Sequence, residues 1–196
     1  MRSPNKRERI LSAATAVFAE RDFHQVLVSE VAERAGVGKG TVYLYFPTKD
    51  DLQRAALEGS LERLAAEVER VATGPGTPDS VLSALVLSIL RFFWRRPHLL
   101  TLAQRFEQRF QRRANARRQR VRRAVEEVLA RHRLGGGVSR PLAAAFLLGL
   151  ARAAILEHGS DERPEASAAR VVGIFLHGLS GYAENGASLR RRGAAG

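Results

Sequence analysis

The chain has 196 residues, of which 45% are hydrophobic, and it contains no cysteine. This length supports one or two domains with a substantial core, and the lack of cysteine excludes disulfide bonds and thiolate metal sites. The formal net charge of +12 favours nucleic acid as a partner. The charge is uneven, however, because residues 1–52 carry a net charge of only +1, whereas residues 105–133 hold eleven arginines and three glutamates.

Neither a membrane segment nor a secretion signal is evident. The first ten residues are mostly polar or charged. The longest apolar stretch, residues 142–156, is shorter than a membrane span and contains Arg152. We therefore expect a soluble cytoplasmic protein without a membrane partner.

The first predicted element is an amphipathic helix that starts near Pro4 and ends near Arg21. Its apolar residues recur at the spacing of one helical face: Ile10, Ala14, Val17 and Phe18. We expect this face to pack behind the elements that follow, with Phe23 closing the small core. Three cations near the start of the helix are predicted either to reach phosphates or to be ordinary surface charges: Lys6, Arg7 and Arg9.

Residues 28–52 (VSEVAERAGVGKGTVYLYFPTKDDL) hold the most specific pattern in the chain. Their spacing predicts a short helix, a tight turn and a second short helix over residues 39–46. Gly36 stands where a left-handed residue ends the first helix, and Val37 is an apolar plug in the turn. Three apolar residues share the inner face of the first helix: Val31, Ala32 and Ala35. This arrangement predicts a helix-turn-helix.

The second helix of this pair has an outer face suited to DNA. Val42 and Phe46 lie four residues apart on its inner side. The outer side then carries a cation, a hydroxyl and two phenols: Lys39, Thr41, Tyr43 and Tyr45. A short helix with such a surface fits the major groove. Pro47 ends it, and Thr48 followed by Asp51 predicts a capping box that opens the next helix.

A long helix is predicted over residues 49–72, and the sequence GPGTP at residues 74–78 then breaks the periodic pattern. We place the domain boundary there. The prediction is a helix-turn-helix domain over residues 1–52, a linking helix over residues 49–72, and a second domain over residues 73–196.

The second domain is also predicted to be helical throughout. Its helices are expected at residues 79–96, about 98–104, 105–133, 140–158 and 164–184. The tail from residue 185 is predicted to be disordered. The fold class is therefore all-α with about nine helices, without strands or internal repeats.

Residues 32–52 resemble the DNA-reading segment of the TetR-type bacterial repressors. The family pattern is an Ala-Gly-Val turn, then Gly-Thr-x-Tyr-x-Tyr-Phe, then Lys-x-x-Leu. Its residues here are Ala35, Gly36, Val37, Gly40, Thr41, Tyr43, Tyr45, Phe46, Lys49 and Leu52. The match covers the first quarter of the chain, and the remainder is similar only in helical layout. The family usually has Ser where Gly38 stands and often Thr, touching a phosphate, where Leu27 stands.

The resemblance implies an N-terminal three-helix DNA-binding domain and a C-terminal helical domain for ligand binding and dimerisation. The DNA-binding residues it implies are Lys39, Gly40, Thr41, Tyr43, Tyr45 and Lys49. Among them, Lys39, Thr41 and Tyr45 are expected to meet base edges or nearby backbone, whereas Tyr43 and Lys49 are expected to hold phosphates. The alternative for both tyrosines is that they are simply half-buried aromatic residues.

The resemblance also implies a homodimer through the last two helices and a small-molecule effector of unknown identity in the second domain. The expected lining residues are Phe92, Phe93, Phe106, Phe110, Arg117, Phe146 and Leu150. For the aromatic residues, ordinary core packing is the alternative. Arg117 falls where an apolar residue is expected, so it is predicted to bind an acidic ligand group or an intrachain partner such as Glu107 or Glu126.

The leading hypothesis is a repressor that binds a palindromic operator as a homodimer and is released by a small-molecule ligand. The alternative is a DNA-binding architectural or cell-cycle factor of the same fold without an effector. For the segment 105–133, the alternatives are non-specific attraction to DNA and codon bias. An enzyme is not expected, and neither is a cofactor or a metal, because the five histidines lack metal-ligand spacing.

Overall fold

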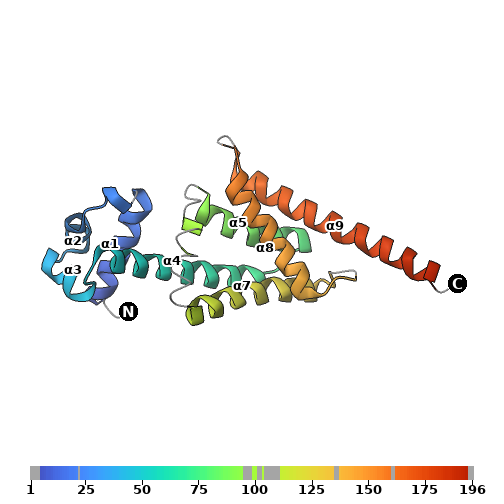
Figure 1. Ribbon diagram of the computed structural model, residues 1–196, viewed down its shortest axis with the longest axis horizontal. Coiled ribbons are helices and arrows are strands. Elements are labelled where there is room, and N and C mark those ends of the chain that lie inside the picture. The colour runs from blue at the N-terminus through green and yellow to red at the C-terminus, as the bar shows by residue number, and fades with distance from the viewer. Residues whose placement is uncertain are drawn as a thin grey trace. The chain divides into compact units, whose positions relative to one another are not determined.

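The computed structural model describes residues 5–21, 23–94, 99–100, 103, 111–134, 137–159 and 162–193, with the backbone alone for residues 19, 23, 111–114 and 179–193. Within these ranges there are eight α-helices and one short 3-10 helix, and no strand (Figure 1). The all-α class predicted from the sequence is confirmed. The chain divides into two compact units, Met1–Arg63 and Leu64–Gly196.

The first unit contains three short elements that follow an N-terminal helix. Its elements are α1 (Lys6–Glu20), η1 (Phe23–Gln25), α2 (Val28–Ala35), α3 (Lys39–Tyr45) and the first half of α4 (Lys49–Ala72). Helix α1 begins slightly later than the sequence pattern predicted, because Asn5 caps it. The Asn5 side chain accepts a hydrogen bond from the Glu8 backbone N–H (2.9 Å), and the Glu8 carboxylate accepts one from the Asn5 N–H (3.0 Å).

One apolar core joins the helices of this unit. Its buried residues are Ile10, Ala13, Ala14, Val17, Val26, Val28, Val31, Ala32, Ala35, Val42, Phe46, Leu52 and Ala56. The set includes every inward-facing residue predicted for the helix-turn-helix. Phe18 and Val37 are half-buried and pack against the same core. Because Leu52 and Ala56 belong to it, the first turns of α4 are held against the helix-turn-helix by packing.

The turn between α2 and α3 depends on a glycine and on an arginine from α1. Gly36 adopts the left-handed conformation (φ 63°, ψ 45°), as predicted. The Arg9 guanidinium donates hydrogen bonds to the carbonyls of Ala35 (2.6 Å) and Gly36 (3.0 Å). A Cβ atom at residue 36 would lie 2.6 Å from Arg9 Nη2. Glycine is therefore needed both for backbone conformation and for space, and Arg9 binds the turn.

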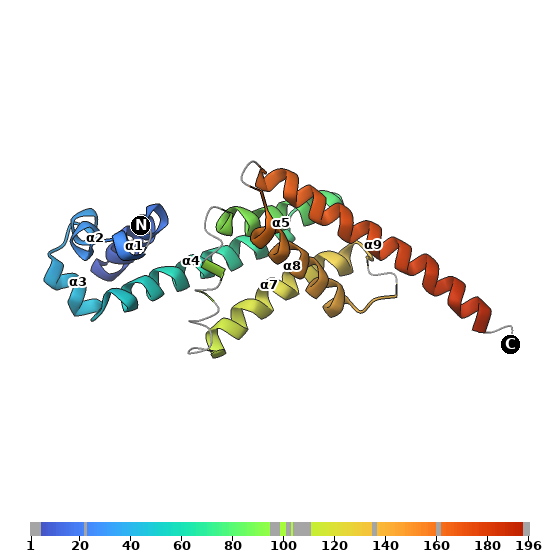
Figure 2. The ribbon, with the colours of Figure 1, turned by 45° about the horizontal axis from the view of Figure 1, so that its top comes forward.

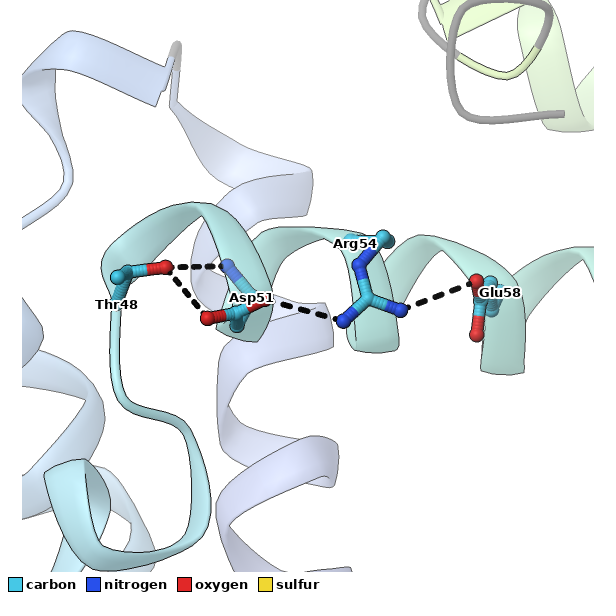
Figure 3. Close-up of polar contacts among 4 residues, drawn as sticks. All are labelled: Thr48, Asp51, Arg54 and Glu58. Carbon is cyan, nitrogen blue, oxygen red and sulfur yellow. Dashed lines mark hydrogen bonds and ion pairs between the residues drawn. The ribbon is translucent and has the colours of Figure 1, made fainter. Parts of the chain in front are cut away.

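The N-terminus of α4 is capped by a connected set of side chains (Figure 3). Thr48 Oγ1 accepts a hydrogen bond from the Asp51 backbone N–H (3.0 Å) and donates one to Asp51 Oδ2 (2.7 Å). Arg54 donates to Asp51 Oδ1 (3.1 Å) and pairs with Glu58 at 3.5 Å. The predicted cap at Thr48 is confirmed. The hydrogen bond from Thr48 and the one from Arg54 hold the pKa of Asp51 below its ordinary value.

The second unit is built from the end of α4 and four further helices. These are α5 (Pro78–Phe93), α7 (Gln111–Arg131), α8 (Arg140–Glu157) and α9 (Pro164–Gly193). Helix α5 packs against α9, α8 and α7, and α8 contacts both α7 and α9 (Figures 1 and 2). Seven side chains of α5 are buried: Val81, Leu82, Leu85, Val86, Ile89, Leu90 and Phe93. In the part of the chain that the structure describes, no helix has the length and apolarity needed to span a bilayer.

Two sequence-based expectations for this unit concern the segment after α5 and the C-terminal tail. The helix predicted at about residues 98–104 lies mostly outside the described residues. The disordered tail predicted from residue 185 is wrong, because α9 continues to Gly193. The segment SLRRR near its end consists of residues that a helix accommodates at small cost.

Residues 105–133 form an arginine-rich segment. Two of its arginines bind the C-terminal end of α4 within this unit. Arg120 makes a two-pronged ion pair with Glu69, with distances of 2.7 Å from Nε to Oε1 and 2.6 Å from Nη2 to Oε2. Arg131 donates a hydrogen bond to the Ala72 carbonyl (2.7 Å), which lies in the last turn of α4. The Arg120 hydrogen bonds hold the pKa of Glu69 below its ordinary value. Part of this segment's charge therefore has an intrachain role.

Candidate nucleic-acid interface

Helix α3 has seven residues and two faces of opposite character. Val42 is 1% exposed and anchors the helix in the core of the first unit. Phe46, the residue that ends the helix, is 4% exposed and lies in the same core. On the other side, Lys39 and Gly40 are exposed and Thr41 is half-buried. Because the inner face is fully used by packing, the outer face is the part of α3 available to a partner.

The two tyrosines of α3 extend this outer surface. Tyr43 and Tyr45 are each 41% exposed. A phenol that keeps two fifths of its surface can donate a hydrogen bond to a phosphate or a base edge. Lys49, the last of the predicted DNA-binding residues, is half-buried at the first position of α4. The structure thus brings all six predicted residues together in the first unit, within one helix and the start of the next.

Gly40 is not required by the fold of the chain itself. Apart from the adjacent residues and the backbone of α3 itself, a Cβ atom built on it would have no atom of the described chain within 4 Å, and its φ is not left-handed. A glycine inside a helix costs up to about 1 kcal/mol relative to alanine. Since neither intrachain space nor backbone conformation explains it, Gly40 fits a position where a partner surface approaches the backbone closely.

The residues around α3 contain one feature that the sequence analysis missed. Leu44 is 81% exposed, more than any other large hydrophobic residue in the described part of the chain. The outer face predicted from the sequence consists of a cation, a hydroxyl and two phenols, and it includes no aliphatic residue. The helical period predicts this exposure, because Leu44 is two residues from the buried Val42 and therefore lies about 200° around the helix from it.

The cations near the start of α1 have contacts within the protein. Arg9 binds the turn after α2, as described above. The Arg7 guanidinium carbon lies 5.5 Å from the centroid of the Phe46 ring, within the range of a cation–π contact. Arg9 therefore contacts the turn before α3, and Arg7 contacts the residue that ends α3. The sequence suggested phosphate contacts for these arginines instead.

The predicted effector-lining residues lie on several helices of the second unit. Phe92 is half-buried and Phe93 is 6% exposed, and their rings meet edge to face with centroids 4.7 Å apart. Arg117 on α7 and Leu150 on α8 are half-buried. Phe106 and Phe110 lie outside the described residues. Phe146 is 51% exposed on α8, so within this single chain it faces away from the core.

The histidines of the described chain show no metal-binding arrangement. Among the described residues there is no group of three or more histidine, cysteine or acidic side chains that would hold a metal ion. His158 has a structural explanation, since its ring stacks on Trp94 with centroids 4.0 Å apart. Trp94 in turn donates a hydrogen bond to the Glu162 carbonyl (3.2 Å). This contact joins the ends of α5 and α8 to the start of α9.

A pair of short helices joined by a glycine turn, packed on a third helix and exposing the second of the pair, defines the class of helix-turn-helix proteins. The family described as "Bacterial regulatory proteins, tetR family" matches residues 10–56, which cover this motif from α1 into α4. Residues 10–56 are therefore similar to the N-terminal domain of this family.

The name of a curated relative agrees with this similarity. The repressor KstR of Mycolicibacterium smegmatis, named an HTH-type transcriptional repressor, is 41% identical over 98 residues, which is 50% of this chain and 48% of that protein. The chain spans about half the length, or less, of the first curated relatives it matches.

Solved structures share the fold of both units. A TetR/AcrR-family transcriptional regulator from Thermobifida fusca aligns with a TM-score of 0.72 at 23% identity, covering 89% of this chain and 98% of that one. FadR from Bacillus subtilis, solved in complex with stearoyl-CoA, aligns with a TM-score of 0.62 at 21% identity, covering 87% of this chain and 98% of that one. At these identities the likeness concerns the fold.

Replacing Gly40 with alanine tests whether α3 contacts DNA. We expect Gly40→Ala to raise the free energy of unfolding by a few tenths of a kcal/mol up to about 1 kcal/mol, and yet to weaken binding to a duplex selected from a random-sequence library. Thermal unfolding and fluorescence anisotropy measure the two effects. Gly59→Ala is the matched control, since its added Cβ would meet only Arg63 at 3.7 Å. Unchanged DNA affinity in Gly40→Ala would contradict the close approach.

Proposed function

We propose that the protein is a transcriptional repressor that binds a palindromic operator as a homodimer and leaves it when a small-molecule effector binds the second unit. The observation that carries this proposal is the exposed outer face of α3 on a fully packed helix-turn-helix core. The named repressor among the relatives supports the same function.

In this proposal α3 lies in the major groove and divides the work between two kinds of contact. Lys39, Thr41 and Tyr45 meet base edges or nearby backbone, and these contacts specify the sequence. Tyr43 and Lys49 hold phosphates and set the register of the protein on the duplex. Because residues 1–52 carry a net charge of only +1, we expect few phosphates to be neutralised and a shallow dependence of affinity on salt.

A homodimer through α8 and α9 is the second part of the proposal. Four large apolar residues on these two helices are exposed in the single chain: Leu142 (47%), Phe146 (51%), Leu156 (47%) and Ile174 (55%). On α8 the exposed residues follow one helical stripe that also contains Gly149 and Ala153. An apolar stripe of this kind on two neighbouring helices suits a self-complementary interface. An operator with two half-sites requires two copies of α3 about 34–36 Å apart, and a homodimer supplies the two copies.

The effector is proposed to be a long-chain acyl-CoA thioester. The FadR structure with stearoyl-CoA supports this class of ligand. Phe92, Phe93 and Leu150 are apolar residues on helices that pack together, and Arg117 supplies a guanidinium for an anionic group. The ligand must bind one conformation of the protein more tightly than the other to have any effect. Helix α4, which runs through both units, is the proposed mechanical link.

Selection of operator sequences and three alanine variants test the DNA-binding face. At about 0.15 M salt, the protein should enrich an inverted repeat from genomic fragments. Lys49→Ala should weaken binding to all sequences and lower the salt slope by about 2, because one phosphate contact is lost in each half-site, and Tyr43→Ala should weaken all sequences without changing the slope. Thr41→Ala should lower the specificity ratio about fivefold per half-site, the equivalent of one hydrogen bond of roughly 1 kcal/mol in each half-site. If all three variants bound the operator as the wild type does, the assignment of the DNA-contact residues would be refuted. Recovery of many unrelated genomic fragments in the selection would favour an architectural factor.

The dimer is tested by placing a charge in the proposed interface. Ile174→Glu should convert a dimer into a monomer at micromolar concentration in sedimentation velocity, because a carboxylate would be buried without a partner. Operator affinity should fall on the order of a hundredfold as the second half-site is lost. Ala84→Glu, which places the same charge on an exposed residue of α5 outside the proposed interface, is the matched control. A wild-type monomer at this concentration would contradict the dimer.

The effector class is tested by release of the operator. Stearoyl-CoA should lower the anisotropy of a labelled operator complex, whereas coenzyme A and stearate alone should not. Arg117→Ala should weaken the response, and Arg123→Ala, an exposed arginine on the same helix, should leave it unchanged. Neither release nor heat of binding with any acyl-CoA would contradict this ligand class while leaving DNA binding intact.

A further inference from the structure

Exposed large hydrophobic residues gather at two places in the described chain. One group lies on α8 and α9 and is assigned above to the dimer. The other lies in the first unit, and its members are Leu27, Tyr43, Leu44 and Tyr45. Single exposed apolar residues need no explanation, but three consecutive ones on a seven-residue helix are a patch. The tyrosines have hydroxyl groups that account for their exposure, whereas Leu44 has none.

Leu44 occupies the most outward position of α3. With about 100° per residue, Leu44 lies roughly opposite the buried Val42, and Gly40 lies one turn before it on the same side. The space over Gly40 is open, because no atom of the described chain would approach a Cβ there within 4 Å. The centre of the outer face is therefore an aliphatic side chain beside bare backbone, with polar side chains on either side of it.

This arrangement matches one chemical group in the major groove. The base edges there present hydrogen-bond donors and acceptors, and the C5 methyl group of thymine is the apolar group among them. A leucine cannot donate to a phosphate or read a donor–acceptor pattern. We propose that Leu44 is a specificity-determining residue that contacts the 5-methyl group of a thymine in each half-site. This inference rests on the proposed function, since it requires α3 to lie in the major groove.

The contact predicts that Leu44 reads the methyl group and not the base. Replacement of thymine by deoxyuridine removes only that methyl group and keeps the hydrogen-bonding pattern. Removing one methyl group from an apolar contact should weaken binding about fourfold, and about fifteenfold when both half-sites are changed. A 5-methylcytosine at the same position should restore part of the methyl contact in a G·C pair.

The experiment uses the full-length protein and a duplex selected by it from a random-sequence library. Each thymine of the selected duplex is replaced in turn by deoxyuridine, and affinity is measured by fluorescence anisotropy. Wild type should lose affinity at one thymine per half-site. Leu44→Ala should bind the thymine and deoxyuridine duplexes equally, whereas Leu44→Met, which keeps an apolar side chain of similar volume, should retain the discrimination.

Leu27→Ala is the matched control, because it truncates another exposed leucine of the first unit and should keep the wild-type response to deoxyuridine. Circular dichroism should show native helicity for all variants, since Leu44 is 81% exposed. A wild-type protein insensitive to deoxyuridine at every thymine would overturn the inference, and so would a Leu44→Ala variant that keeps the discrimination. In both cases specific binding of the selected duplex would remain. Failure to enrich any sequence would instead refute the proposed function together with this inference.

Discussion

The burial of Val42 and Phe46 is the contact on which the candidate site depends. Helix α3 has seven residues, and isolated helices of fewer than about 12 residues are marginal in water. It is therefore helical because these two side chains, 1% and 4% exposed, pack into the core shared with α1, α2 and α4. Since these two side chains provide the packing, the exposed parts of α3, including Lys39, Gly40 and Leu44, can face a partner without loss to the fold.

The turn before α3 fixes its direction in the same way. Gly36 supplies the left-handed backbone, and Arg9 reaches across from α1 to the carbonyls at the end of α2. The carbonyls at a helix C-terminus carry partial negative charge, so a guanidinium there adds charge-assisted hydrogen bonds to the cap. Through Arg9, α1 therefore stabilises the turn that orients α3.

Most of the first unit could be predicted from the sequence because the rules that shape it are local. The spacing of apolar residues located the helices, and Gly36 and Thr48 marked a helix end and a helix start. Arg9 could not be assigned, since its acceptors lie 26 and 27 residues away and cations near a DNA-binding motif suggest phosphates. Leu44 was missed for a different reason: an aliphatic residue is expected inside, so its outward position on the helix was not considered.

Contacts between residues far apart in the sequence also limit what can be predicted for the arginine-rich segment, residues 105–133. Two interpretations of its arginine content were non-specific attraction to DNA and codon bias. The structure instead pairs Arg120 with Glu69, and Arg131 with the Ala72 carbonyl. Helix α4 is thus held at one end by the core around Leu52 and at the other by these arginines. Between them lie Gly59 and Ser60, whose hydroxyl donates to the Ala56 carbonyl (2.9 Å), and helices bend at such pairs. In the proposed mechanism, a displacement of the Ala72 end that an effector causes must travel through this pair to reach α3.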